Sequence, residues 1–123
     1  MIRAAYLCEF PSVNGGENSL LSFLQSAQPH VHPVFLCPGT GLLAERLGAE
    51  GIERYEFRLT DHSGQRKSAQ QVSADLLQLL ARIEVDLVHA NSLSMSRILG
   101  RVAGDLACPA VGHIRDILNV SNK

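Results

Sequence analysis

A single connection, Glu9-Phe10-Pro11-Ser12-Val13-Asn14-Gly15-Gly16-Glu17-Asn18-Ser19-Leu20, decides how this sequence folds. The apolar run Ala4–Cys8 before it has the length of a buried strand, and Leu20–Ala27 after it repeats apolar residues at helical spacing. The connection therefore leads from a first strand into a first helix. In an open α/β sheet such a junction lies at the carboxyl edge, where ligands bind.

Gly15 and Gly16 are the residues of this connection that suit a bound anion. Glycine adopts positive φ and lets a ligand approach the backbone closely. The free N–H groups at the start of a helix also attract negative charge. The spacing is not G-x-G-x-x-G, so the dinucleotide fingerprint is absent. The alternative is a tight strand-to-helix turn, and the two glycines alone do not decide between the two.

The rest of the chain alternates short apolar strands with amphipathic helices. We expect strands at 33–37, 53–59, 86–90 and 109–114, and helices at 42–50, 72–83 and 94–106. Thr40 and Ser68 are candidate N-caps, Gly51 is a left-handed helix stop, and Gly100 and Gly104 would let the last helix pack closely on the sheet. Residues 60–67 are expected to form a mobile loop. This order predicts an α/β, Rossmann-like three-layer αβα sandwich with a mostly parallel sheet.

The composition is that of an ordinary globular domain: 123 residues, 46% apolar, 19% charged and a net charge of −1. A broad nucleic-acid surface is not expected at this charge. No apolar run approaches the ~20 residues that span a bilayer. Cys8, Cys37 and Cys108 lie on or beside the expected strands, which favours core thiols in a reducing cytosol over a disulfide or a metal site.

Right-handed crossovers bring three connections, 9–16, 89–92 and 113–116, to one edge of the sheet. Within them, His89 is by default a core histidine. Asn91 and Ser92 either cap the next helix or contact hydroxyl groups of a ligand, and capping is the favoured role of Ser92. Arg115 pairs either with a phosphate or carboxylate of a ligand or with a neighbour such as Asp116. Residues 117–123 have no partner unit, so we expect the chain to be part of a larger protein.

Four motifs follow one another along the chain: Val13-Asn14-Gly15-Gly16-Glu17-Asn18-Ser19-Leu20-Leu21, Pro38-Gly39-Thr40-Gly41-Leu42-Leu43-Ala44-Glu45-Arg46-Leu47, Asp86-Leu87-Val88-His89-Ala90-Asn91-Ser92 and Gly112-His113-Ile114-Arg115-Asp116. This set resembles the N-terminal half of the family 4 retaining glycosyltransferases, which have the GT-B fold. The resemblance implies two Rossmann-like domains that face each other over a cleft. Residues 1–123 would be the N-terminal, acceptor-side domain. The C-terminal domain, which binds a nucleotide-diphosphate sugar, is absent from this chain.

The resemblance also implies roles for individual residues. Gly15 and Gly16 would lie against the donor diphosphate and the acceptor, and His113 would be the catalytic residue that contacts the transferred sugar. The substrate-binding positions would be Asn14, Glu17, His89, Asn91, Ser92 and Arg115. Neither a cofactor nor a dedicated metal is implied, because the nucleotide-diphosphate sugar is a co-substrate.

The hypothesis is therefore a glycosyltransferase of carbohydrate biosynthesis that acts with retention on a glycan or glycolipid acceptor. The chain alone is expected to be inactive. Cytoplasmic location is expected, with peripheral contact at the inner face of the membrane and a homodimer through the uncovered face left open. A flavodoxin-like signalling module loses support because the first connection offers only Glu9 as an acidic residue. Half of a GT-B sugar-nucleotide epimerase remains an alternative. Sequence beyond Lys123 would distinguish it from a glycosyltransferase.

Overall fold

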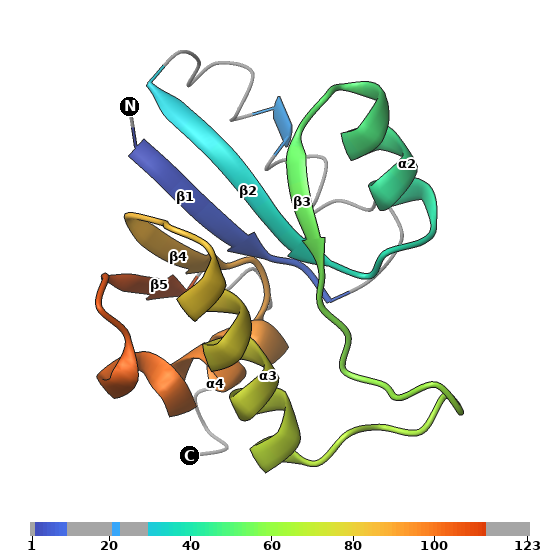
Figure 1. Cartoon of the computed structure of the whole chain (residues 1–123), viewed down its shortest axis with the longest axis vertical. Helices are drawn as coiled ribbons and strands as arrows, with labels where there is room; N and C mark the ends of the chain where they lie inside the picture. Colours follow the sequence, from blue (N-terminus) through green and yellow to red (C-terminus); the bar gives the residue numbers. More distant parts are fainter. Residues whose placement is uncertain (1, 10–20, 23–29, 113–123) are drawn as a thin grey trace, which may run out of the picture.

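The computed structural model describes residues 2–9, 21–22 and 30–112. Within them, five strands form one parallel sheet in the order β3-β2-β1-β4-β5 (Figure 1). The strands are β1 (Ile2–Leu7), β2 (Val31–Cys37), β3 (Glu53–Glu56), β4 (Leu87–Ala90) and β5 (Ala110–Gly112). The chain runs outward from β1 through β2 to β3, and then crosses to β4 and β5 on the other side. The order therefore reverses between β1 and β4, at the place where open α/β sheets bind their ligands.

Helices cover both faces of this sheet. Helices α3 (Ala69–Arg82) and α4 (Leu93–Val102) pack on one face, where the core includes Leu7, Leu36, Leu76 and Met95. Helix α2 (Leu42–Ala49) packs on the other, where the core includes Tyr6, Phe35, Leu43 and Leu47. A short 3-10 helix, η1 (Ala103–Asp105), follows α4. The expected Rossmann-like three-layer α/β sandwich is confirmed.

The central strand is apolar because neither of its faces meets water. Ala4, Ala5, Tyr6 and Leu7 are all buried, and successive side chains enter opposite cores. The edge strand β3 shows the opposite pattern, with Glu53 and Tyr55 half-buried and Arg54 and Glu56 exposed. The strand lies at the edge of the sheet and ends at Glu56, whereas the sequence pattern predicts 53–59. No helix among the described residues is long and apolar enough to cross a membrane.

Helix α2 begins and ends at glycines. Its N-cap is Gly41, with φ of 108° and no side-chain cap, so the prediction of Thr40 as N-cap is wrong. At the other end Gly51 has φ of 69°, and its N–H donates to Gly48 O, while the N–H of Ile52 donates to Leu47 O at 2.9 Å. Together these bonds form a Schellman motif. The predicted helix stop at Gly51 is confirmed.

Helices α3 and α4 both begin at serine caps. Ser68 Oγ accepts from the N–H of Gln71 at 3.1 Å, but the Gln71 side chain donates forward to Asp75, so the capping box is only half formed.

The close packing expected of Gly100 and Gly104 is wrong, because a methyl group at either position would meet nothing within 4 Å. The buried stripe of α4 contains Met95, Ile98, Leu99 and Val102, and Gly100 falls on the opposite side.

Gly51→Ala and Gly100→Ala make a matched pair that tests these backbone assignments. Gly51→Ala places a side chain in left-handed backbone, so it should lower the free energy of unfolding by about 1 kcal/mol. Gly100→Ala fills open space on a helix and should raise it by about 0.5–1 kcal/mol. Urea unfolding followed by circular dichroism measures both. Equal effects of the two substitutions would contradict the assignment.

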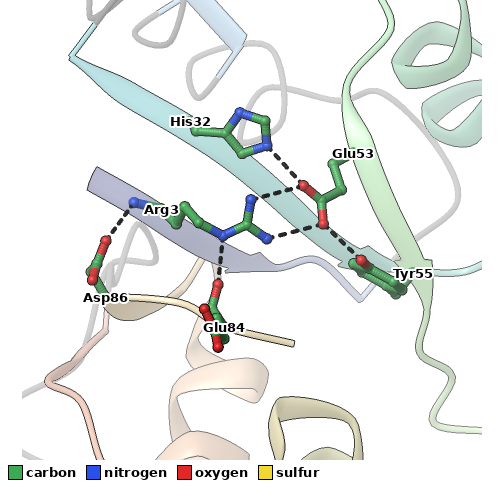
Figure 2. Close-up of polar contacts among 6 residues, drawn as sticks. All are labelled: Arg3, His32, Glu53, Tyr55, Glu84 and Asp86. Carbon is green, nitrogen blue, oxygen red and sulfur yellow. Dashed lines mark hydrogen bonds and ion pairs between the residues drawn. The ribbon is translucent and has the colours of Figure 1, made fainter. Parts of the chain in front are cut away.

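A cluster of polar side chains ties three strands together at the amino edge of the sheet (Figure 2). The guanidinium of Arg3 on β1 donates two hydrogen bonds, each of 3.1 Å, to the two carboxylate oxygens of Glu53 on β3. The same carboxylate accepts from Tyr55 Oη at 2.7 Å, and its Oε1 lies 2.8 Å from His32 Nε2 on β2. Arg3 Nε also donates to the Glu84 carbonyl just before β4. Glu53 is therefore the shared partner of β1, β2 and β3.

This cluster makes stability depend on pH. The Arg3 guanidinium, followed by Tyr55 and His32, lowers the pKa of the Glu53 carboxyl from 4.5 to about 2. A lowered folded-state pKa means that the stabilisation is complete above pH 4.5 and is lost as the pH falls towards 2.

Glu53→Gln should therefore lower the free energy of unfolding by about 1–3 kcal/mol at pH 7, with the lower end favoured because Arg3 is partly exposed. The difference from wild type should vanish near pH 2. Urea midpoints at pH 7, 4 and 2.5 measure it. Glu50→Gln is the control, since Glu50 forms a 3.1 Å pair with Arg46 along α2. It should change stability by less than about 0.5 kcal/mol. A pH-independent cost of Glu53→Gln would contradict the account.

Candidate functional site

The carboxyl ends of β1 and β4 lie side by side. Leu7 pairs with Ala90, and the N–H of Asn91 donates to the Leu7 carbonyl at 3.1 Å. On the other side of β4, Ala90 pairs with Gly112, the last residue of β5. The chain segments that follow β1 and β4 thus start from one edge, as predicted, and the segment after β5 starts beside them. Residue 113 and those beyond lie outside the described residues.

Asn91 is the polar residue that the fold places at the centre of this edge. Its exposure is 4%, which makes it the one buried polar or charged residue in the described part of the chain. A buried amide has a desolvation cost, so natural proteins keep one only where its hydrogen bonds are satisfied. The sequence indicated Asn91 as a cap or an acceptor contact, but its burial could be seen only once β4 was placed against β1.

Ser92 caps α4 and so directs the amino end of this helix to the same edge. Its Oγ accepts from the N–H of Met95 at 3.2 Å, and Ser96 Oγ donates to the Ser92 carbonyl at 2.8 Å. The capping role favoured by the sequence is confirmed. The partial positive charge at the start of α4 therefore lies at the switch point, where it favours an anion. Contact of Ser92 with an acceptor stays a prediction.

His89 lies within β4, where its ring packs against the aromatic core. Its ring meets the Tyr6 ring edge-on, with centroids 5.5 Å apart and an interplanar angle of 61°. Tyr6 in turn lies 5.6 Å from the ring of Phe35, and burial raises the pKa of the Tyr6 hydroxyl. This position matches the core histidine that is the default interpretation of the sequence. A substrate contact by His89 stays a prediction.

Gly112 is a feature of the site that sequence reasoning missed. A methyl group at this position would lie 2.7 Å from Ser96 Oγ and 3.1 Å from Ser96 Cβ. The end of β5 therefore approaches the first turn of α4 so closely that a side chain at 112 would displace one of them. The glycine sets where the chain leaves β5 towards position 113.

Gly112→Ala should lower the free energy of unfolding by about 1–3 kcal/mol, as overpacking does elsewhere. Ser96→Ala removes the hydroxyl that the new methyl group meets, so the double variant should recover part of this loss. A double-mutant cycle of urea unfolding measures the coupling between the two positions. Additive effects of the two substitutions would contradict the close approach.

The remaining predicted site residues lie outside the described residues. They are Asn14, Gly15, Gly16, Glu17, His113 and Arg115. Their roles stay predictions, and only their neighbours Glu9 and Gly112 show where their segments begin.

The thiols and acidic side chains of the described residues form neither a disulfide nor a metal centre. All three cysteines are free, Cys8 and Cys37 are buried, and Cys108 is half-buried, which confirms the expected core thiols. Burial raises the pKa of Cys37 to about 11, so it stays a thiol at neutral pH. Within the described ranges, no group of three His, Cys, Asp or Glu side chains is placed to hold a metal ion.

The chain was compared with known proteins by family, by sequence and by structure. Neither a protein-family model nor a curated protein matches its sequence. Among solved structures, Anabaena Alr3699/HepE in complex with UDP and glucose is similar, with a TM-score of 0.73 and 17% identity over 100% of this chain and 32% of that one. Acinetobacter baumannii MurG is similar with a TM-score of 0.72 and 14% identity over 99% of this chain and 38% of that one.

Both neighbours are glycosyltransferases of the GT-B fold. The likeness, at these identities, shows that the chain has the Rossmann-like fold found in such enzymes. The chain spans about a third of the length of each neighbour.

Proposed function

We propose that this chain is the N-terminal, acceptor-side domain of a GT-B glycosyltransferase that transfers a sugar, with retention, from a nucleotide-diphosphate sugar to a glycan or glycolipid. The observation that carries the proposal is the switch point, where the ends of β1 and β4 meet beside the amino end of α4. The fold of two glycosyltransferases, one of them solved with UDP and glucose, supports it. The order of the four sequence motifs supports the N-terminal position.

The chemistry of the proposed reaction suits this edge. A nucleotide diphosphate carries negative charge, and the amino end of a helix stabilises such charge by roughly 0.3–1 kcal/mol in exposed settings. The amino end of α4, capped by Ser92, is one such element. In the proposal, the backbone N–H groups of Gly15 and Gly16, which precede the helix expected at 20–27, add to this stabilisation of negative charge. Preorganised donors of this kind stabilise the charge that develops on the leaving diphosphate.

His113 has the second role in the proposal. It follows Gly112 directly in the sequence, and Gly112 ends β5 beside Ala90 of β4. An imidazole there would donate a hydrogen bond to the transferred sugar near the reacting carbon. Asn14, Glu17, Asn91 and Arg115 would contact the substrates around it, and the downstream domain would supply the donor site. We further propose a cytoplasmic enzyme, and neither a cofactor nor a metal is required by the proposal.

The test uses the proposed longer protein, in which a second α/β domain would follow this chain. We expect that protein to transfer radiolabelled glucose from UDP-glucose, the first donor to try, to a glycan or glycolipid acceptor, and the 123-residue chain alone to transfer none. His113→Ala in the longer protein should lower kcat by about 10²–10³-fold, as loss of a transition-state donor does, while acceptor KM changes less.

His30→Ala is the matched control, because it removes the same side chain at an exposed position directly before β2, at the amino edge of the sheet. It should leave kcat unchanged. Conversion of UDP-glucose to another sugar nucleotide without an acceptor would point to the epimerase instead. Transfer by the isolated chain, or an unchanged kcat of His113→Ala, would contradict the proposal as stated.

A further inference from the structure

A hollow of about 820 Å³ lies beside the β3 edge of the sheet, between the connection that follows β3 and helix α3. Figure 1 shows this connection leaving the end of β3 and reaching away from the sheet before α3 begins. The volume of the hollow falls in the range of small-molecule sites, which have volumes of roughly 300 to 1,000 Å³.

The outer wall of the hollow is a hairpin turn closed by hydrogen bonds, within the segment 60–67 for which the sequence predicts a loop. Thr60 forms an antiparallel bridge with Arg66, and the N–H of Lys67 donates to Leu59 O at 2.8 Å. At the tip, Asp61 Oδ1 accepts from the N–H of Ser63 at 2.9 Å and from the N–H of Gln65 at 3.0 Å. The wall is therefore held by its own hydrogen bonds and gives the hollow a defined shape.

The lining combines an apolar base with a balanced set of charges. Phe57 and Leu79, which are 4% and 5% exposed, supply the apolar part. The charged lining residues are three acids and three bases, namely Glu56, Asp61, Asp75, Arg58, Lys67 and Arg82. Such a lining has no net attraction for a polyanion, but it offers many hydrogen-bond donors and acceptors over a short distance. A polyhydroxylated ligand matches that pattern.

Two ion pairs hold the carboxylates of the lining in place. Arg58 Nε lies 3.1 Å from Glu56 Oε2, and Lys67 Nζ lies 2.9 Å from Asp75 Oδ2. Each carboxylate has about four lone-pair positions, so each can accept sugar hydroxyls while it keeps its cation. Hydroxyl groups of a ligand would therefore add to these pairs without breaking them.

Arg82 differs from the other two cations of the hollow. It is the exposed last residue of α3, and it makes no ion pair with any of the residues that the structure describes. A guanidinium presents a planar fork of donors that fits a carboxylate. Arg82 is thus a cation of the lining without an acidic partner among the described residues, and an acidic group on the ligand would supply one.

A second, smaller hollow of about 330 Å³ shares Glu56 with the first and reaches Gly39 at the end of β2. Here the Glu56 carboxylate occupies the space that a methyl group on Gly39 would need. The two hollows therefore continue each other along the carboxyl ends of β3 and β2. Since neighbouring strands lie ~4.8 Å apart, the end of β3 is about 10 Å from the end of β1.

We propose that the hollow beside β3 binds an acidic saccharide unit, with its carboxylate on Arg82 and its hydroxyls on Glu56 and Asp75. It would hold a unit of the glycan acceptor remote from the reacting one, and in this respect it rests on the proposed function. The distance along the edge suits a glycan that extends from the β1–β4 switch point towards β3.

The test is a titration of the full chain, followed by amide chemical shifts in NMR, with glucuronate, glucose and UDP as separate probes. Glucuronate should shift the amides of 56–62 and 75–82 and should bind about fivefold more tightly than glucose, the worth of one exposed charge pair. Arg82→Gln should remove this preference and Arg82→Lys should keep part of it. Arg101→Gln, an exposed arginine on α4 outside the hollow, should leave it unchanged.

The inference is overturned if neither sugar shifts the amides of the hollow, or if Arg82→Gln keeps the preference for glucuronate. Its failure is distinct from failure of the proposed function. Sugar transfer by the longer protein, together with absence of saccharide binding here, would reject this inference alone. Binding of glucuronate in the hollow without any transfer by the longer protein would support this inference and reject the proposed function.

Discussion

The pairing of β1 with two parallel neighbours is the constraint on which the rest of the structure depends. Its six residues pair with β2 along their full length and with β4 over the last four. The side chains of β1 alternate between the two cores, one on each face of the sheet. This one strand therefore contacts the core beneath both layers of helices. The same pairing brings Leu7 beside Ala90, so the edge where substrates would bind is a direct consequence of the register.

The two ends of the sheet have different tasks. At the amino edge, the Glu53 carboxylate joins Arg3, His32 and Tyr55, and this cluster has no role in the proposed reaction. At the carboxyl ends of β1 and β4, the described polar groups include the buried Asn91 and the helix cap Ser92. Electrostatic stabilisation at one end thus supports the strand pairing, while the proposed ligand site lies at the other end. Further along that edge, the hollow beside β3 would extend the proposed binding surface.

Much of the architecture could be predicted from local patterns. The apolar runs of the strands, the stripe of α3 and the left-handed stop at Gly51 are signals within a few residues, and the structure confirms them. The error at Thr40 was also local, since Gly41 beside it takes the cap position with positive φ. Gly100 could have been assigned correctly, because the apolar stripe of α4 already placed it on the outer side.

The features that the sequence could not reveal are those that join distant segments. Arg3 and Glu53 are 50 residues apart, and nothing in either segment indicates the other. The same is true of Gly112 with Ser96, of the burial of Asn91 and of the hollow between the β3–α3 connection and α3. For the candidate site, the residues were predicted from the sequence, and the sheet order shows that the strands before them end at one edge. The positions of Gly15, Gly16 and His113 on that edge stay predictions.

The central proposal, that the β1–β4 switch point is half of a sugar-transfer site, is tested most directly by amide hydrogen exchange of the proposed two-domain protein with and without UDP-glucose. The account predicts slower exchange in three segments together: the one after Leu7, the one from Asn91 into α4, and the one after Gly112. Protection confined to the amino edge around Glu53, or none in these three segments although UDP-glucose is bound, would contradict it.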